Sequence, residues 1–384
     1  MNFVLRSKRV LTGGEIRPAD IVINRGVIEE VTDYKIKAIG YDVGNSLIVP
    51  GFVDLHSDAV EKEIEPRPGA HFPIRSALVE LDKKLAMSGI TTMYHAVGFN
   101  DAALTGYRAT EVAAQIIRLI HEANSEQLVL DNLVHARFEV TSFDSIGTIK
   151  KLIDDRCVQL LSVMDHTPGQ GQFKSIETWK KFHLPVYKIS EKEADEIIRE
   201  KQRGKERSFS VVQDLLNYGT EHNLILLSHD DDTRQKINLV KELGVTISEF
   251  PLDVDVAGYA KANGIATGMG APNVVRGQSQ SGNVSARDLI LENSCDFLCS
   301  DYHPSSMLQA PYTIHNEMSL PLNQCFDMVT SRPAELVGMT DRGEIAADKI
   351  ADIVVIEDQL VPKVVLTLKE GTAVYNSSGC LREE

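Results

Sequence analysis

The chain alternates between two hydrophobic patterns along most of its length. Short apolar runs rich in β-branched residues predict eight strands, which begin at positions 49, 90, 128, 158, 224, 245, 265 and 297. Between these runs, apolar residues recur at helical spacing, most clearly over 112–120 and 211–216. Eight strands alternating with helices over about 250 residues are typical of one α/β fold, the (β/α)8 or TIM-type barrel, whose active site lies at the carboxyl ends of the strands. An open, doubly wound sheet is the alternative.

Both ends of the chain follow a different pattern, in which short strand-like runs are separated by turns that contain Gly and Asn. Neither end has enough strands to be stable alone, but the two together have. We therefore expect residues 1–49 and 340–384 to form one small β-sandwich, and residues 50–339 to form the barrel.

One spacing in the barrel is about twice that of a normal strand–helix unit. His166 and His229, which end successive predicted strands, are 63 residues apart. This spacing predicts an insertion at about 174–210. Residues 166–210 hold ten Lys or Arg against seven Asp or Glu, whereas the whole chain has a net charge of −15. The insertion is therefore either a lid that attracts anions or a solvated helix with ion pairs four residues apart.

Composition excludes several classes of protein. With 43% hydrophobic and 25% charged residues the chain is an ordinary globular protein, and its acidity argues against a broad nucleic-acid interface. The N-terminus lacks the apolar core of a signal peptide, and no run approaches the roughly 18 apolar residues of a membrane span. Five cysteines without a CxxC pair predict buried thiols in a reducing compartment. We expect a cytoplasmic protein that binds neither nucleic acid nor membranes.

Possible metal ligands stand at the ends of the predicted strands. The first strand ends in His56 and Asp58, which a period of two places on one face. The third, fourth, fifth and eighth strands end in or just before Glu139, His166, His229 and Asp301. Because these ends converge in a barrel, they predict a site for a divalent metal. Further candidates at strand ends or nearby are His95, Asp165, Asp230 and His303.

Several sequence blocks carry a family resemblance. The first strand end PGFVDLHSD, the flanking short strands and the late segment GEIAADKIADIVVIE resemble the metal-dependent amidohydrolase superfamily. The blocks HSDAVEKEIEPRPG, SVMDHTPGQGQF, LSHDDDT, GAPNVVRGQSQSGNVSA and SDYHPSSML are similar to its PhnM branch, the diphosphatases of the carbon–phosphorus lyase pathway. This resemblance covers nearly the whole chain. It implies hydrolysis of a phosphorylated sugar, alpha-D-ribose 1-methylphosphonate 5-triphosphate, to the 5-phosphate and pyrophosphate.

The resemblance also implies a ligand set. The superfamily's HxH motif falls on His56 and Asp58, and this HxD form is typical of the PhnM branch and suits an oxygen-rich site. Glu139 takes the place of a bridging carboxylate or carboxylated lysine, His166 and His229 match the two later imidazoles, and Asp301 matches the aspartate of the last strand. Most members place these imidazoles on strands five and six, whereas the count here gives four and five. Either the count is wrong by one or the ligand set differs.

The implied cofactor is one or two divalent ions, of Zn, Mn or Fe. Asp301 is then the candidate catalytic residue, because a carboxylate beside an activated water can orient or deprotonate it.

Phosphate contacts are expected from two loops at the same end of the barrel. Lys62, Arg67 and Arg75 follow the first strand, and Arg67 is held in a stiff segment between two prolines. Asn273, Arg276 and Ser281 belong to the glycine-rich segment after the seventh strand, a frequent phosphate site in this fold. A tight turn with a surface arginine is the alternative for the second loop.

Two other functions compete with the diphosphatase. A hydrolase of the same fold that acts on a C–N bond, such as a deacetylase or cyclic amidase, would need no basic loops. A non-catalytic component of a multiprotein phosphonate complex would need no metal. The chain is also compatible with a homo-oligomer.

Overall fold

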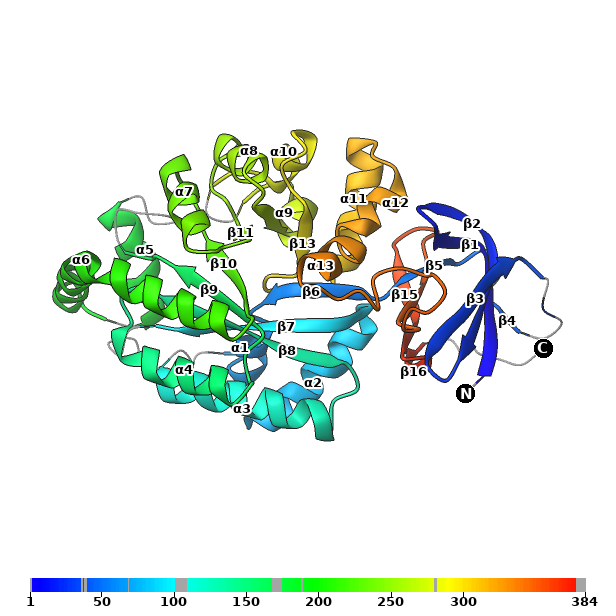
Figure 1. Ribbon diagram of the computed structural model, residues 1–384, viewed down its shortest axis with the longest axis horizontal. Coiled ribbons are helices and arrows are strands. Elements are labelled where there is room, and N and C mark those ends of the chain that lie inside the picture. Colours follow the sequence, from blue (N-terminus) through cyan, green and yellow to red (C-terminus); the bar gives the residue numbers. More distant parts are fainter. Residues whose placement is uncertain are drawn as a thin grey trace.

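The computed structural model describes residues 2–35, 37, 40–67, 69–100, 109–167, 175–187, 189–279 and 282–377. A large part of alternating strands and helices lies beside a smaller part made of strands alone, and the smaller part combines segments from the beginning and the end of the chain (Figure 1). Among the described residues, no helix is both long and apolar enough to cross a lipid bilayer.

The larger part is a parallel barrel of eight strands. The strands pair side by side in chain order from first to last. A parallel bridge between Ser57 and Asp301 joins the last strand to the first, where the Asp301 N–H donates to the His56 carbonyl at 3.0 Å. Each strand begins within three residues of its predicted position, so the predicted barrel is confirmed. The strands are β6 (Phe52–Ser57), β7 (Ile90–Phe99), β8 (Asp131–Glu139), β9 (Leu160–Met164), β10 (Ile225–His229), β11 (Ile247–Glu249), β12 (Ala266–Gly270) and β13 (Phe297–Cys299).

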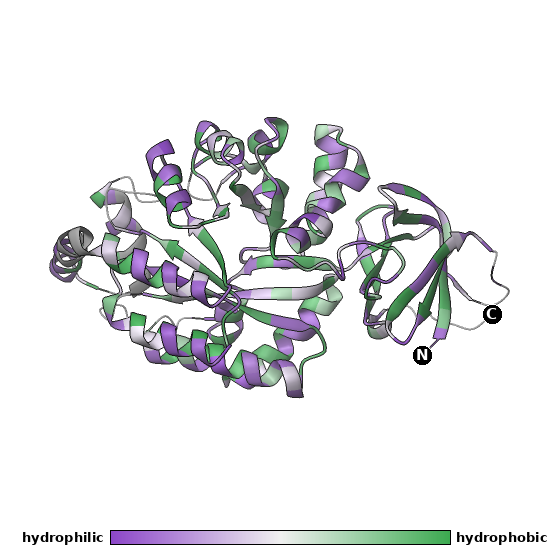
Figure 2. Ribbon diagram, in the orientation of Figure 1, coloured by the Kyte–Doolittle hydropathy of each residue, from purple (hydrophilic) through white to green (hydrophobic). Residues whose placement is uncertain are grey.

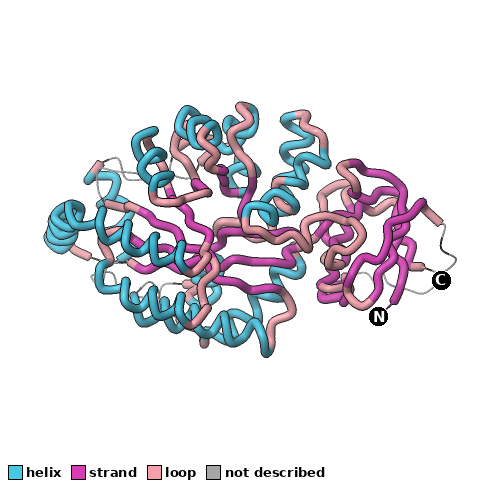
Figure 3. Tube along the Cα trace, in the orientation of Figure 1, coloured by secondary structure: helices cyan, strands magenta, loops and turns pink. Residues whose placement is uncertain are grey.

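Helices surround the barrel (Figure 3). They bury one apolar face each, as in α3, where Ile116, Ile117 and Ile120 are fully buried. Figure 2 shows the same division, with hydrophobic residues on the strands and polar residues on the outer helix faces. The helices are α1 (Ala59–Ile64), α2 (Ile74–Met87), α3 (Thr110–Glu126), η1 (Phe143–Ser145), α4 (Ile146–Asp154), α5 (Ile176–Tyr187), α6 (Glu191–Glu221), α7 (Arg234–Glu242), α8 (Val254–Ala262), α9 (Ala271–Arg276), α10 (Ala286–Leu291), α11 (Ser306–Met318), α12 (Leu322–Asp327) and α13 (Ser331–Leu336).

The long connection between β9 and β10 contains two helices, α5 and α6. Helix α6 has 31 residues and starts with a capping box formed by Ser190 and Glu193. Its last turns pack on the barrel, with Leu215 and Leu216 fully buried, while its first turns enclose the fully buried Trp179 of α5. Helix α5 and the first turns of α6 therefore share a small core of their own. Both helices lie at the end of the barrel far from the small domain (Figure 1).

The smaller part is one continuous sheet in the order β16-β15-β14-β5-β1-β2-β3, with β4 paired to β1. Strand β5 joins the two chain ends, because it pairs with β1 on one side and with β14 on the other. The sheet curls around one core, so that the β2–β3 turn meets the β15–β16 turn, and the Ala351 N–H donates to the Gly26 carbonyl at 2.8 Å. The expected domain from both chain ends is thus present. Its strands are β1 (Asn2–Thr12), β2 (Glu15–Asn24), β3 (Val27–Asp33), β4 (Tyr41–Asp42), β5 (Leu47–Pro50), β14 (Ile353–Glu357), β15 (Lys363–Lys369) and β16 (Thr372–Asn376).

A buried ionic network ties this sheet to the amino ends of the barrel strands. The Lys369 ammonium of β15 lies 2.9 Å from a carboxylate oxygen of Asp352 and 2.9 Å from one of Asp131, which begins β8. Arg342 pairs with the same Asp131 and donates to the Thr92 hydroxyl of β7 at 2.9 Å. Because Lys369 is 6% exposed, these charges are held largely out of water.

Lys369→Met should lower the free energy of unfolding by about 2 to 4 kcal/mol, because it leaves two carboxylates buried beside each other with one cation fewer. Urea unfolding measures the change. Lys363→Met is the matched control on the same strand, since Lys363 pairs with Glu357 at the surface and its loss should cost less than about 1 kcal/mol. Equal effects of the two substitutions would show that the network does not couple the domains.

Candidate metal centre

All six residues predicted as metal ligands lie at the carboxyl end of the barrel. His56 is the last residue but one of strand β6, and Asp58 follows that strand directly. Glu139 ends β8 and His229 ends β10. His166 and Asp301 lie just after β9 and β13. The parallel strands therefore bring together side chains that are up to 245 positions apart in the chain.

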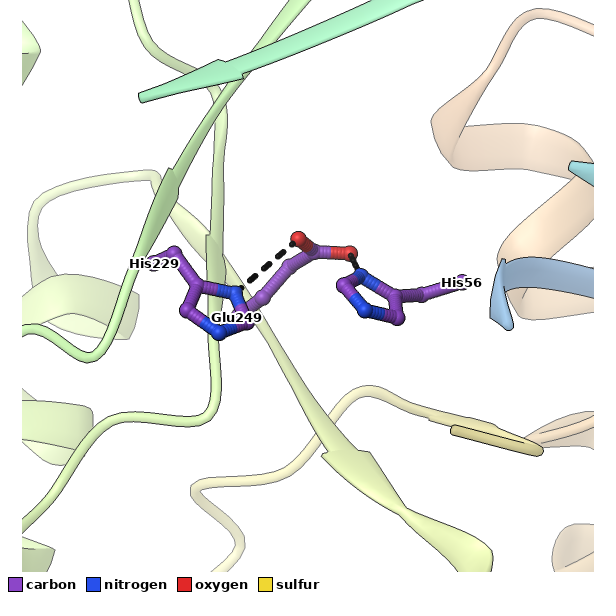
Figure 4. Close-up of side chains that lie close together, drawn as sticks. All are labelled: His56, His229 and Glu249. Atoms are coloured by element: carbon purple, nitrogen blue, oxygen red, sulfur yellow. Dashed lines mark hydrogen bonds and ion pairs between the residues drawn. The ribbon is translucent and has the colours of Figure 1, made fainter. Parts of the chain in front are cut away.

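One group of possible ligands is formed by His56, His229 and Glu249. Figure 4 shows the Glu249 carboxylate between the two imidazole rings. His56 Nδ1 lies 3.1 Å from Glu249 Oε1, and His229 Nδ1 lies 3.6 Å from Glu249 Oε2. Ligand atoms at about 2.0 to 2.2 Å from one tetrahedral ion are roughly 3.3 to 3.6 Å apart. The spacing of this group is therefore that of a metal site.

A second group shares His229 and adds His166 and Asp230. Asp230 Oδ2 lies 3.6 Å from His166 Nε2 and 3.7 Å from His229 Nε2. Glu139 orients His166 from the other side, because Glu139 Oε2 is 2.9 Å from His166 Nδ1 and Glu139 Oε1 accepts the His166 backbone N–H at 3.1 Å. A carboxylate that fixes an imidazole in this way is common behind metal-bound histidines.

The donor set fits a divalent cation. Glu249 Oε2, Asp230 Oδ2 and His229 Nδ1 are buried and make no hydrogen bond in the structure. Buried polar atoms are normally satisfied, so the two carboxylate oxygens without a hydrogen bond, one on each side of the His229 ring, suit a partner with positive charge. Burial and the nearby Arg137 charge hold the pKa of His56 and His229 well below the usual value, so both rings are neutral and have a lone pair to donate.

The carboxylates of the site repel one another. Burial raises the pKa of Glu249 to about 7, and burial also raises the pKa of Asp54, which lies beneath the site, to about 7. The pKa of Asp301 is likewise about 7, first because of burial and next because of the Asp58 charge. A bound cation would favour the ionised form of all three groups.

Three non-glycine residues at the site have left-handed backbone conformations. Asp230 and Phe250, each directly after a strand, have φ of 53°, and Asp301, two residues after β13, has φ of 57°. Such conformations are strained for these residue types and are maintained by the surrounding structure. Asp231 braces one of these turns, because its carboxylate accepts from the Ser228 and Ser248 hydroxyls of β10 and β11.

The six predicted ligands differ in their place at the site. His56, His166 and His229 belong to the two groups of possible ligands. Glu139 holds His166. Asp58 and Asp301 are neighbours, because the Asp58 N–H donates to the Asp301 carbonyl at 2.7 Å. The other four candidates are distributed as follows: Asp230 joins the second group, Asp165 accepts from the Thr167 N–H at 3.0 Å, His95 pairs with Asn132 at 2.8 Å, and His303 is exposed.

Sequence reasoning missed Glu249. The sixth apolar run, which begins at Val245, ends in this carboxylate, so the rule applied to the other strand ends would have found it. The strand count was right, since His166 follows the fourth barrel strand and His229 ends the fifth. Most family members place an imidazole at the end of the sixth strand. In this chain the sixth strand ends in Glu249 instead. His135 and Arg137 were also missed, although a period of two places them on the same face of β8 as Glu139.

Two of the residues predicted to bind phosphate meet beside Asp301. The Arg276 guanidinium donates to the Tyr302 hydroxyl at 3.3 Å. The Lys62 ammonium lies over the ring of the same tyrosine, 5.5 Å from its centroid. Tyr302 directly follows Asp301 in the chain, so both cations contact the residue next to a candidate ligand.

The other predicted phosphate contacts are more dispersed. Arg67 is exposed, in the loop after α1. Arg75 pairs with Glu122 and Glu126 of α3. Asn273 supports the loop after α9, because its side chain accepts from the Ala286 N–H at 3.0 Å and donates to the Val284 carbonyl at 3.3 Å. Ser281 lies outside the described residues.

Comparison with known proteins identifies the family. Residues 195–375 match the model of the Amidohydrolase family. The chain is also 30% identical over 356 residues to the alpha-D-ribose 1-methylphosphonate 5-triphosphate diphosphatase of Escherichia coli (strain K12), across 91% of this chain and 94% of that protein. This chain belongs to the amidohydrolase family. The resemblance noted in the sequence blocks is thereby confirmed.

Solved structures of other amidohydrolases share the fold. N-acetylglucosamine-6-phosphate deacetylase from Pasteurella multocida superposes with a TM-score of 0.65 at 12% identity, over 98% of this chain and 100% of that one. Dihydropyrimidinase from Brevibacillus agri NCHU1002 gives 0.60 at 11% identity, over 98% and 95%. Amidohydrolases are typically metal-dependent hydrolases, and the His, Asp and Glu groups described above suit that chemistry.

Glu249→Gln should weaken divalent metal binding by at least about 10-fold, because an amide oxygen replaces a charged ligand oxygen. Metal content after dialysis against graded metal buffers measures the effect. Glu292→Gln, at the exposed end of α10, is the matched control and should leave metal content unchanged. Equal metal retention in all three proteins would exclude Glu249 as a ligand.

Relative to Glu249→Gln, the metal-free wild type should lose stability as the pH rises from about 4 to about 7. A carboxyl group with a higher pKa in the folded chain binds more protons when folded, so its stabilising effect is complete below the unfolded pKa and is lost as the pH rises through the folded value. For Glu249 this window runs from about 4 to about 7, whereas the lowered pKa values of His56 and His229 affect both proteins alike. Scanning calorimetry should show the midpoint of the wild type falling relative to that of Glu249→Gln over this range. A constant difference between the two midpoints would contradict the raised pKa of Glu249.

Proposed function

We propose that the protein hydrolyses alpha-D-ribose 1-methylphosphonate 5-triphosphate to the 5-phosphate and pyrophosphate, in phosphonate degradation. The observation that carries the proposal is the likeness to the Escherichia coli diphosphatase, which extends over nine-tenths of both chains. The position of Lys62 and Arg276 supports it, because both cations contact Tyr302, which follows Asp301 in the chain. A chain with a net charge of −15 needs such local positive charge to bind a polyphosphate.

His56, His229 and Glu249 would hold one ion, and His166 with Asp230 offers a second position that shares His229. Asp58, Glu139 and Asp301 complete the predicted ligand set at the rim of these groups. When bound, a divalent ion of Zn, Mn or Fe would supply positive charge beside the phosphate oxygens and would acidify a water molecule.

Asp301 is the proposed general base. Its carboxylate lies close enough to Asp58 to feel that charge. A bound cation would keep it ionised and able to accept a proton from water. We assign to Asp301 the orientation and deprotonation of the attacking water.

Lys62 and Arg276 would bind the phosphate groups from the rim, with Tyr302 between them. Asn273 would act by holding the loop that follows α9, and Arg67 remains a proposed contact from the exposed loop after α1. Arg75 and Ser281 remain proposed contacts, although Arg75 is paired with two glutamates of α3. Pyrophosphate is a good leaving group once such charges screen it, so no covalent intermediate is required.

The alternative is hydrolysis of a C–N bond, as in the structurally similar deacetylase. That likeness is one of fold. A small uncharged amide would make no use of the basic rim, whereas N-acetylglucosamine 6-phosphate carries a phosphate that could. Incubation of the metal-loaded protein with N-acetylglucosamine 6-phosphate tests the alternative by acetate release. A purely structural role within a phosphonate complex would instead be indicated by less than one metal ion per chain after purification without chelator.

Phosphorus NMR of the products formed from the authentic triphosphate tests the proposal directly. The intact protein should release pyrophosphate and the ribosyl 5-phosphate, and Asp301→Asn should be slower by about 100-fold or more, the usual effect of losing a general base. Asp214→Asn on the exposed face of α6 is the matched control and should retain full activity. Release of orthophosphate, or equal rates in the intact protein and Asp301→Asn, would contradict the assignment.

A further inference from the structure

We propose that Arg137 is a substrate-binding residue, whose guanidinium binds the phosphoryl oxygens of the substrate inside the metal centre. This inference rests on the proposed function and identifies the group within the site that distinguishes a phosphoanhydride from a neutral amide. Neither the strand-end pattern nor the basic rim includes this residue.

Arg137 lies near the carboxyl end of β8, between His135 and Glu139 on the face that points into the barrel. It is 7% exposed, so its charge is held inside the protein. Its Nη2 donates to His229 Nε2 at 3.1 Å, and its buried Nε makes no hydrogen bond. Within the part of the chain that the structure describes, no carboxylate forms an ion pair with it.

An arginine in this state is unusual. A buried guanidinium is normally paired with a carboxylate, because removal of an unpaired charge from water is costly. Here Arg137 donates instead to the neutral ring of His229, whose other nitrogen lies 3.6 Å from the Glu249 carboxylate. Arg137 therefore stands in the centre of an acidic site with its donors largely unused.

Metal binding would release even its one hydrogen bond. Arginine can only donate, so His229 Nε2 must accept with its lone pair. If His229 binds metal through Nε2, that lone pair is taken. If it binds through Nδ1, the neutral ring has its proton on Nε2 and again cannot accept. In either case the Arg137 guanidinium loses its protein partner when the site is loaded.

The partner that fits is a phosphate oxygen. The planar guanidinium has five N–H donors in a fork that matches two oxygens of one phosphate group. Such charge-assisted pairs are strong where water is excluded. An amide carbonyl beside a metal has no second negative oxygen for this fork, so a buried, unpaired arginine selects for phosphorylated substrates.

The experiment compares Arg137→Met and Arg137→Lys with the wild type in the metal-loaded full-length protein. Titration calorimetry with inorganic pyrophosphate measures anion binding, and metal content is determined before and after each titration. We expect Arg137→Met to bind pyrophosphate about 10- to 100-fold more weakly, the usual effect of losing a charged hydrogen-bonded pair, with undiminished metal content. Arg137→Lys should fall between, because it keeps the charge but loses the fork.

Arg234→Met is the matched control. Arg234 begins α7 at the same end of the barrel, but it is exposed and pairs with Asp255, so its loss should leave pyrophosphate affinity within about twofold. Affinities of both Arg137 variants within threefold of the wild type, at equal metal content, would overturn the proposal. A weaker affinity that merely follows a loss of metal would overturn it too, since Arg137 would then only balance charge.

If Arg137→Met does not fold, the pyrophosphate affinity of Arg137→Lys tests the proposal by itself, because the lysine variant keeps the buried charge that the carboxylates require. The two proposals also fail separately. Absence of pyrophosphate release by the wild type from the authentic triphosphate would refute the proposed function, whereas unchanged pyrophosphate binding by the Arg137 variants of an active enzyme would refute this inference alone.

Discussion

The structure depends above all on the concentration of negative charge at one end of a buried barrel. Asp54, Asp230, Glu249 and Asp301 converge there, and the Arg137 charge acts on both Glu249 and Asp301. Burial makes each ionised carboxylate costly, so two of these groups that face the site, Glu249 and Asp301, have pKa values near 7. This arrangement favours either bound protons or a divalent cation.

The charges at the opposite end of the barrel, by contrast, are paired with one another. Lys369, Asp352, Asp131 and Arg342 there form a closed network of paired charges between the barrel and the small sheet. Its charges are satisfied by the protein itself, whereas Glu249 and Asp230 at the carboxyl end leave buried atoms without a hydrogen bond. The first cluster is thus a structural ion network, whereas the second has the unpaired buried atoms that are typical of a ligand site.

Positive charge is concentrated at particular points of this barrel mouth. A deacetylase and a dihydropyrimidinase share the fold, so the fold alone does not choose the substrate. In this chain Lys62 and Arg276 meet on Tyr302, and Arg137 lies inside. A polyphosphate would meet cations from both directions.

The sequence by itself determined the eight barrel strands, the domain built from both chain ends and most of the chemistry at the strand ends, because strand period and apolar runs are local properties. It identified His56, His166 and His229 in this way. The tertiary structure alone decided that Glu249 and Asp230 join them, that Lys62 and Arg276 meet on Tyr302, and that Arg75 turns to α3. Contacts between side chains depend on register, barrel closure and backbone turns such as those at Asp230 and Asp301, which no local pattern encodes.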